Sequence, residues 1–231
     1  MIVFDMAGTT VNEDNIVYKT LTKSLNEVGG YNVSLEDVLA HGAGKEKLQA
    51  IRSVLKNSLN LVDEALSKRV FENFLTSLKL AYETEDIFPG GNAEELFAIL
   101  KSKNILRVLN TGYDRNTAEF LLTKLKWSVG IDIDGLITAS DVEKNRPEPD
   151  MINLAMQKFA IKSPLSVAKI GDSTIDIEEG KNAGCALSIG ITTGAHTASQ
   201  LSSANPDYII NDLMELIAIL ESETQNSKTH N

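Results

Sequence analysis

Hydrophobic and polar positions alternate in two different ways along the chain. From about Leu96 onward, short apolar runs that end in small polar residues alternate with segments in which apolar residues recur at helical spacing. The apolar runs are residues 105–112, 165–173, 185–191 and 207–211, and the helical segments between them include residues 115–127 and 149–159. Strands that alternate with helices are typical of crossover connections. We therefore expect an α/β core built on a doubly wound parallel sheet.

The block between the first strand and this alternating region has helical spacing throughout. Its helical segments are residues 16–30, 34–42, 44–59 and 61–83. Ser34 followed by Asp37 is typical of a capped helix start, and FPGG at residues 88–91 marks the return to the sheet. We expect a core domain formed by residues 1–13 and 87–221, an inserted all-helical domain over residues 14–86, and a flexible tail over residues 222–231.

Composition and charge narrow the class of protein. The 231 residues are 42% hydrophobic and 23% charged, which is ordinary for a soluble globular protein. The net charge of −10 argues against nucleic acid and against an anionic membrane surface, because both partners require clustered Lys and Arg. The sequence shows no apolar run near 18 residues and no signal-peptide pattern, so we expect a cytoplasmic protein. The single Cys185 fits a reducing compartment.

Candidate chemistry lies directly after the expected strands. Asp5 follows the first strand in VFDMAGTT (residues 3–10), Thr111 follows the second, and Asp172 with Asp176 follows a later one. Ligands of an open parallel sheet bind at the carboxyl ends of its strands, so we expect these side chains at one edge. Each aspartate taken singly is explained as well by a turn or a helix cap. Crowded carboxylates repel unless a cation neutralises them, and an aspartate-rich oxygen site suits Mg²⁺.

Four motifs carry a family resemblance. They are DMAGT (residues 5–9), NTGY (110–113), RPEPD (146–150) and GDSTIDIEEGKNAG (171–184). In order and spacing they resemble the motifs of the haloacid dehalogenase superfamily, and the helical insertion is similar to that superfamily's C1-type cap domain. The resemblance implies a Rossmann-like core with a cap and a hydrolase activity. Ala7 and Arg146 stand where most superfamily phosphatases have aspartate and lysine, and in this they resemble the phosphonatase (phosphonoacetaldehyde hydrolase) branch.

The resemblance also implies roles for particular residues. Asp5 is the expected nucleophile, which forms an aspartyl-phosphate that water hydrolyses. Mg²⁺ is expected between Asp5, the carbonyl of Ala7, Asp172 and, directly or as an orienting group, Asp176. The phosphoryl oxygens are expected to meet Thr111, the Gly112 amide and Arg146, with Tyr113 and His41 as further substrate contacts.

Ala7 raises the question of how the leaving group departs. In the ester-cleaving relatives the aspartate at this place is the general acid, and a methyl group cannot donate a proton. In phosphonatases a cap lysine forms an imine that accepts the electrons of the breaking carbon–phosphorus bond. The resemblance places that lysine at Lys45, in HGAGKEKL, while a phosphate contact and a solvated surface position stay open for it. Leu48 stands where the phosphonatase cap has a histidine.

The sequence thus predicts a Mg²⁺-dependent, phosphonatase-like hydrolase of a small phosphorylated or phosphonate metabolite. Cleavage of a carbon–phosphorus bond with Lys45 as the Schiff base is the first hypothesis. The alternatives are a phosphatase of the phosphoglycolate phosphatase or phosphoglucomutase type, which acts on a phosphate ester, and an inactive phosphate-binding module. The expected partner is the small-molecule substrate alone, bound by a monomer or a homodimer.

Overall fold

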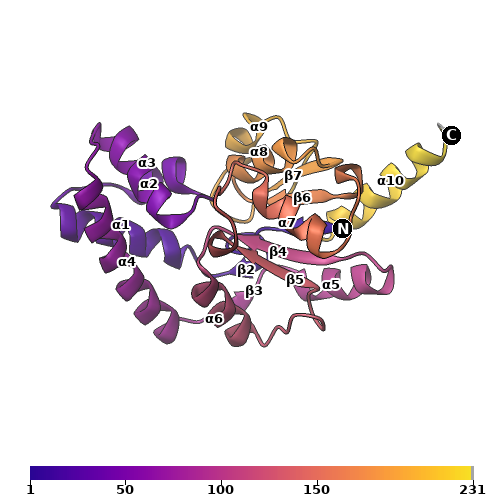
Figure 1. The fold of residues 1–231 in the computed structure, drawn as a ribbon, viewed down its shortest axis with the longest axis horizontal. Helices are drawn as coiled ribbons and strands as arrows, with labels where there is room; N and C mark the ends of the chain where they lie inside the picture. The colour runs from indigo at the N-terminus through magenta and orange to yellow at the C-terminus, as the bar shows by residue number, and fades with distance from the viewer. Residues whose placement is uncertain (230–231) are drawn as a thin grey trace.

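A six-stranded parallel sheet forms the centre of the molecule. The structure is a computed structural model that describes residues 1–229 (Figure 1). The sheet has the order β5-β4-β1-β6-β7-β8, and all neighbouring strands are parallel. The strands are β1 (Ile2–Phe4), β4 (Arg107–Thr111), β5 (Gly135–Thr138), β6 (Ala168–Gly171), β7 (Leu187–Ile191) and β8 (Tyr208–Ile210). The predicted doubly wound α/β core is confirmed, and the strand order reverses at β1, which is where such sheets bind ligands.

Helices cover both faces of this sheet, which is why its central strands are buried along their whole length and are mostly apolar. Side chains of successive strand residues point to opposite faces, so Val3 packs in the cluster that contains α7, whereas Ile2 and Phe4 pack in the other cluster. The core helices are α5 (Ala93–Ser102), α6 (Arg115–Leu125), α7 (Asp150–Lys158), α8 (Thr174–Asn182), α9 (Ala198–Ser202) and α10 (Glu215–Thr229), with 3₁₀ turns at Ala139–Asp141 and Pro164–Ser166.

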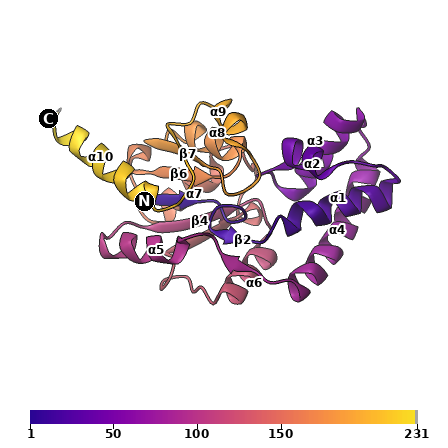
Figure 2. The ribbon, with the colours of Figure 1, turned by 180° about the vertical axis from the view of Figure 1, so that it is seen from behind.

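The helical insertion forms a separate body beside the carboxyl end of β1, and we call it the cap. It consists of α1 (Ile16–Gly29), α2 (Leu35–Gly42), α3 (Lys47–Leu59) and α4 (Glu64–Thr84). A short antiparallel ribbon of β2 (Val11–Asn12) and β3 (Phe88–Pro89) joins it to the core. Figures 1 and 2 show the cap at one end of the molecule and α10 at the other.

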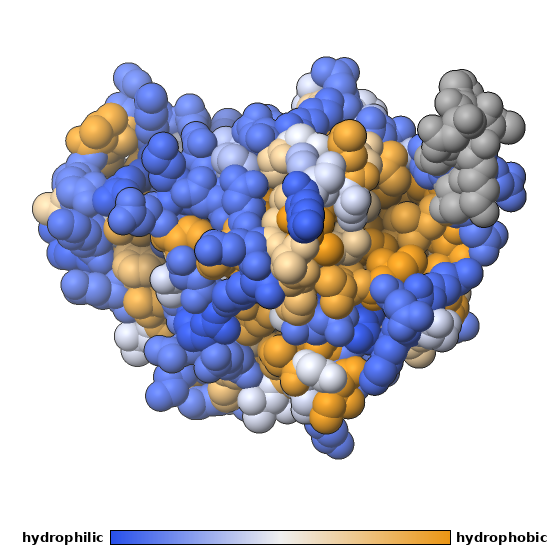
Figure 3. All heavy atoms as spheres, turned by 45° about the vertical axis from the view of Figure 1, so that its right-hand side comes forward, coloured by the Kyte–Doolittle hydropathy of each residue, from blue (hydrophilic) through white to orange (hydrophobic). Residues whose placement is uncertain are grey.

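Two boundaries differ from the sequence pattern. Helix α3 begins at Lys47 rather than at residue 44, because the Glu46 carboxylate accepts hydrogen bonds from the amides of Leu48 and Gln49 and so caps the helix. Residues 222–229, which the sequence analysis assigns to a flexible tail, are helical within α10, and residues 230–231 lie outside the described residues. On the side that carries the termini, hydrophobic residues gather in an area bordered by polar ones (Figure 3). Among residues 1–229, no helix is long and apolar enough to cross a membrane.

Candidate active site

Asp5 lies at the carboxyl end of β1, the central strand. Its amide donates to the carbonyl of Ile170 on β6 (2.9 Å), and its own carbonyl accepts from the Thr10 hydroxyl (2.8 Å). The chain then turns tightly, since the Met6 carbonyl accepts three successive amides, those of residues 9–11. Asp5 is therefore held on a fixed backbone, and its side chain is buried.

Three carboxylates meet at this point. Asp5, Asp172 and Asp176 each offer an oxygen within 4.8 Å of the others, and all three are buried. Burial and the neighbouring Asp176 raise the pKa of Asp5, and burial and Asp5 raise the pKa of Asp172 well above its usual range. The two carboxylates thus resist being ionised together, as expected for ligands of a cation.

Backbone glycines leave room for Asp172. A Cβ added to Gly8 would lie 2.3 Å from Asp172 Oδ2, and one added to Gly194 would lie 1.9 Å from the same atom. The amide of Ala195 donates to this oxygen at 2.6 Å. Glycine is required at both positions because any side chain would displace the carboxylate from the acidic cluster.

Arg146 joins Asp5 to the rest of the sheet edge. Its Nη1 donates to Asp5 Oδ1 at 2.7 Å and forms an ion pair with Asp176 Oδ1 at 2.9 Å. Its Nη2 donates to the carbonyl and side-chain oxygens of Asn110, at 2.9 and 2.7 Å. Although burial disfavours the charge, Asp176, Glu179 and Asp5 raise the pKa of Arg146, which stays cationic.

A second buried cation lies beneath the first. Lys169 Nζ lies 2.9 Å from Asp176 Oδ1 and 3.5 Å from Glu179 Oε2. Asp176 therefore receives both cations on one oxygen and the Ser173 hydroxyl on the other, at 2.5 Å. Burial opposes ionisation of Asp176, but the two cations hold its pKa below the usual value. Asp176 is thus oriented by the protein itself, whereas Asp5 and Asp172 form the more electrostatically strained pair.

The buried charges do not balance. The cluster contains two cations, Arg146 and Lys169, and four carboxylates, Asp5, Asp172, Asp176 and Glu179. Uncompensated charge is costly in a protein interior, and a divalent cation with oxygen ligands would offset the excess. The residues present therefore fit a metal ion at Asp5 and Asp172.

The expected phosphoryl-binding turn follows β4. The amide of Tyr113 donates to the Thr111 hydroxyl at 3.2 Å, and a Cβ added to Gly112 would lie 2.6 Å from the Lys45 carbonyl oxygen of the cap. Gly44 of the cap accepts from Arg146 through its carbonyl (3.3 Å) and donates through its amide to the Tyr18 hydroxyl (3.0 Å). The cap backbone thus lies directly on the core site.

The two cap lysines differ in where their ammonium groups lie. Lys45 Nζ donates to the His41 carbonyl (2.6 Å) and to the Ser53 hydroxyl (3.3 Å), within the cap. Lys47 is only 7% exposed, and its Nζ lies 4.8 Å from the centre of the Tyr113 ring and 3.1 Å from the Lys45 carbonyl. Lys47, rather than Lys45, therefore presents its amine to the core turn.

Sequence reasoning missed Lys47 although a signal was present. Lys47, Ala50, Ile51 and Val54 are all buried and recur at helical spacing, so they share the inward face of α3. Lys45 precedes the first residue of that helix. His41 contributes its carbonyl to Lys45 from the last turn of α2, and the structure brings it to Lys45 rather than to Asp5.

Glu13 is a further buried carboxyl that the sequence analysis did not select. It lies between β2 and α1, is 3% exposed, and accepts hydrogen bonds from the Tyr82 hydroxyl (2.5 Å) and the Val17 amide (3.1 Å). Burial raises its pKa to about 7 against these two bonds. Its sequence context, VNEDN, is a polar linker, and nothing in that pattern distinguishes it from a solvated residue.

A cavity of about 310 Å³ opens between cap and core at this site. Its lining includes Lys47 and Gly112 together with Glu46, Phe71, Leu75, Asp114, Ala139 and Ser140. Lys47 and the expected phosphoryl-binding turn therefore border one space, large enough for a small phosphorylated molecule.

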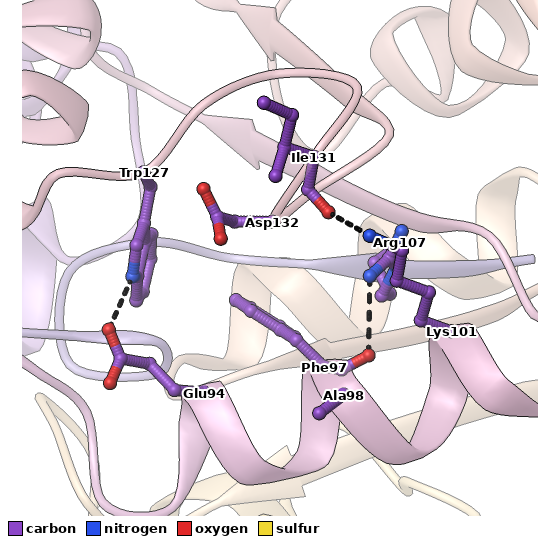
Figure 4. Close-up of a pocket in the computed structure, with 8 residues that line it drawn as sticks. All are labelled: Glu94, Phe97, Ala98, Lys101, Arg107, Trp127, Ile131 and Asp132. Atoms are coloured by element: carbon purple, nitrogen blue, oxygen red, sulfur yellow. Dashed lines mark hydrogen bonds between the residues drawn. The ribbon is translucent and has the colours of Figure 1, made fainter.

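A separate hollow of about 200 Å³ lies along α5, near the amino end of β4 (Figure 4). It is at the end of that strand opposite to Thr111. Its polar groups bond to one another, in the pairs Trp127 with Glu94, Arg107 with the Phe97 carbonyl, and Lys101 with the Ile131 carbonyl. This hollow is distinct from the candidate site.

Comparisons with known proteins agree with this geometry. Residues 2–223 match the family model of the haloacid dehalogenase-like hydrolases. The chain is 27% identical to the phosphonoacetaldehyde hydrolase of Latilactobacillus sakei over 99% of this chain and 97% of that protein. It is 24% identical to the phosphoglycolate phosphatase of Vibrio vulnificus over 95% of each. The crystal structure of a phosphonoacetaldehyde hydrolase-like protein from Oleispira antarctica has the same fold, with a TM-score of 0.83 at 21% identity over 96% of this chain and 91% of that one.

Proposed function

The chain belongs to the haloacid dehalogenase-like hydrolases, which confirms the resemblance of its four motifs, and we propose that it is a Mg²⁺-dependent hydrolase of a small phosphonate with a carbonyl group. The bond that we propose is cleaved is the carbon–phosphorus bond, and the proposed intermediate is an aspartyl-phosphate on Asp5. The observation that carries this proposal is the pairing of a methyl group at Ala7 with a buried lysine, Lys47, which lines the same cavity as Gly112 and whose amine lies 4.8 Å from the centre of the Tyr113 ring.

Asp5 has the setting of a nucleophile. One oxygen is held by Arg146 at 2.7 Å, which fixes the side chain and leaves the other oxygen for attack on phosphorus. The Gly112 amide and the Thr111 hydroxyl would bind the phosphoryl oxygens, and Arg146 adds a fixed positive charge at the site of a protein whose net charge is −10. When bound at Asp5, the Ala7 carbonyl and Asp172, Mg²⁺ would neutralise the repulsion between an anionic nucleophile and an anionic substrate.

Ala7 matters in the step in which the leaving group departs. The Lys47 amine condenses with the substrate carbonyl and releases water, which gives a cationic imine. Asp5 then attacks phosphorus, the carbon–phosphorus bond breaks, and its electron pair moves into the imine to form an enamine. Protonation of the enamine and hydrolysis return the amine and release the aldehyde, while water cleaves the aspartyl-phosphate to inorganic phosphate. No proton donor at Ala7 is needed on this route.

The lysine assignment departs from the one that the motif resemblance suggests. Lys45 bonds within the cap, whereas burial lowers the pKa of Lys47, against the opposing charges of Asp5 and Glu13, and so favours the neutral amine that attacks a carbonyl. A phosphatase that acts on an ester is the second candidate, favoured by the 24% identity to a phosphoglycolate phosphatase. That activity would need a proton donor other than Ala7.

To decide between these two activities, the protein and Mg²⁺ are incubated with phosphonoacetaldehyde or with a panel of phosphate esters, each with and without borohydride. We expect release of acetaldehyde and phosphate, and a borohydride-trapped adduct that peptide mass spectrometry locates at Lys47. Lys47→Ala should abolish trapping and Lys45→Ala should retain it. Asp5→Asn should abolish turnover and still allow trapping. Ester turnover without an adduct would overturn the carbon–phosphorus assignment, and an adduct at Lys45 would overturn the role of Lys47.

A further inference from the structure

Glu13 is buried, titratable and unused in the steps described above. It belongs to the linker that connects the core to the cap, and it is 3% exposed. A buried carboxyl lowers stability unless its hydrogen bonds and charge are matched. The Oε2 atom of Glu13 accepts hydrogen bonds from both the Tyr82 hydroxyl and the Val17 amide. The fold therefore provides two specific partners for this buried carboxyl.

A chain of hydroxyls leads from Glu13 to the phosphoryl-binding turn. The Tyr82 hydroxyl, on α4 of the cap, bonds to Glu13 at 2.5 Å and lies 2.7 Å from the Tyr113 hydroxyl. Tyr113 directly follows Gly112 in the core. The chain therefore crosses from the linker through the cap to the core, and all three side chains are buried.

The far end of this chain supports Lys47. The Lys47 ammonium lies 4.8 Å from the centre of the Tyr113 ring and 5.6 Å from that of Tyr18, and aromatic faces attract cations at such distances. Because the Tyr113 hydroxyl is held by Tyr82, the orientation of the ring under the amine is fixed as well. A change at Glu13 would thus reach Lys47 without direct contact.

We propose that Glu13 is a positioning residue: it acts through Tyr82 and Tyr113 to hold the Lys47 amine beside the phosphoryl-binding turn, and its carboxylate is the counter-charge of that amine. This inference rests on the reactive role of Lys47 proposed above. It goes further by assigning control of the amine to a residue outside the four motifs.

The pKa shifts of Glu13 and Lys47 agree with an electrostatic interaction between these two side chains. Burial lowers the pKa of Lys47, and the negative charges of Asp5 and Glu13 oppose that shift. Burial is also the main cause that raises the pKa of Glu13, and Lys47 opposes it. The groups that act on Lys47 are Asp5 after β1, Glu13 in the linker, Glu46 beside it, and Arg146, with the rings of Tyr18 and Tyr113. Removal of the Glu13 charge should therefore lower the pKa of Lys47 further.

The test measures Lys47 directly, without any substrate. The whole protein is treated with formaldehyde and cyanoborohydride at a series of pH values, and methylation of each lysine is followed by peptide mass spectrometry. In Glu13→Gln, the pH midpoint for Lys47 should fall by about one unit, because the glutamine oxygen still accepts from Tyr82 but carries no charge. Lys56, exposed on the same helix, is the internal reference and should keep its midpoint.

Turnover provides the second readout. Glu13→Leu, which removes the acceptor of the Tyr82 hydroxyl as well as the charge, should lower kcat about tenfold or more and change KM by about threefold at most, since substrate contacts remain. Tyr82→Phe cuts the hydroxyl chain and keeps the carboxylate, so it should lower kcat and leave the methylation midpoint of Lys47 nearly unchanged. Glu36→Gln, an exposed carboxylate of α2, is the matched control and should behave as wild type.

The two proposals fail in different ways. An unchanged Lys47 midpoint in Glu13→Gln would overturn the counter-charge, and an unchanged kcat in both Glu13→Leu and Tyr82→Phe would overturn the positioning role. If wild type turns over no phosphonate and no ester, the proposed function falls, and the methylation midpoint still decides whether Glu13 controls Lys47. Should Glu13→Gln fail to fold by circular dichroism, Glu13→Asp keeps the charge with a shorter reach and should keep the midpoint while lowering kcat.

Discussion

Glu13 lowers the stability of the folded protein above neutral pH. Its pKa is about 7 in the folded state and 4.5 when the side chain is solvated in the unfolded chain, so between these pH values the folded form holds a proton that the unfolded form has lost. Stability then falls as pH rises, since the folded state binds more protons. Proteins commonly retain groups that lower stability where their function needs them, and a buried carboxyl such as Glu13 is a group of this kind.

This difference can be measured. Between pH 5 and pH 8, wild type should lose about 2 to 3 kcal/mol of unfolding free energy relative to Glu13→Gln, whose side chain does not titrate. Urea unfolding of both proteins at four pH values, without metal, gives the comparison. Parallel profiles for the two proteins would show that the carboxyl titrates at its ordinary pKa in the folded state.

Single residues were predictable where the chemistry coincides with a strand end. Asp5, Thr111 and Asp172 follow apolar runs, and the structure brings them to one sheet edge. Lys47 was accessible only through its place on the buried face of α3, a signal weaker than the motif spacing that selects Lys45. Glu13 could not be predicted, because its burial depends on Tyr82, which lies 69 residues away in the chain.

Helix α2 shows how an element is bounded by local chemistry. The Ser34 hydroxyl accepts from the Asp37 amide at 3.1 Å, and the Asp37 carboxylate accepts from the Ser34 amide at 3.2 Å, which is a reciprocal cap. This helix ends at Gly42, immediately before the cap loop that lies on the core site. The position of the loop therefore depends on a correctly started helix.

Removal of this cap should affect stability before activity. Ser34→Ala should lower the unfolding free energy by about 1 kcal/mol, because the Asp37 amide loses its acceptor. Thermal or urea unfolding measures the change, and Ser199→Ala, at an exposed position of α9 that is not one of its caps, serves as the control. Equal stability of Ser34→Ala and wild type would mean that the start of α2 frays without consequence.

Elements were predictable in proportion to their length and periodicity. The long helices of the cap and the apolar strands β4, β6 and β7 follow the hydrophobic pattern closely. Strand β5 was not predicted, because it has only four residues, begins with Gly135, and is identified by its pairing with β4 rather than by its own pattern. Local sequence could also not show that Glu46 starts α3, since that requires its backbone to leave the helical conformation.

At the scale of the whole molecule, the net charge of −10 would repel the anionic substrate proposed above. The structure concentrates positive charge where it is needed: Arg146, Lys169 and Lys47 are all buried near the carboxyl ends of the central strands. Even so, carboxylates outnumber cations in the cluster around Asp5. A bound cation should therefore stabilise the entire fold rather than the site alone.

Magnesium should raise the melting temperature. A ligand at a hundredfold excess over its Kd adds about 2.7 kcal/mol, which for a chain of this size corresponds to about 5 to 10 °C. Differential scanning fluorimetry with and without Mg²⁺ measures the shift. In Asp172→Asn the shift should vanish, while the metal-free protein should be at least as stable as wild type because one of the repelling carboxylates is gone. A full shift in that variant would place the metal elsewhere.

The arrangement of the strands and of the cap in space could not be predicted from the hydrophobic pattern of the sequence. Strand order and the closed position of the cap depend on contacts between segments far apart in sequence, such as Gly112 against the Lys45 carbonyl. Which cap side chains face the core follows from that closure, and the two cap lysines illustrate the difficulty, since they are two residues apart and differ in direction.

The contact between the cap loop and Gly112 also sets a kinetic condition. With the Lys45 carbonyl 2.6 Å from where a Cβ of Gly112 would be, the backbone of the cap lies against that of the core, and the neighbouring Gly44 carbonyl accepts from Arg146, which holds the proposed nucleophile Asp5. In the proposed reaction, the contact that keeps bulk water away would also retain inorganic phosphate after hydrolysis. Each turnover therefore requires that the contact break once to admit substrate and once to release product, so the rate at which the cap opens is an upper limit on kcat.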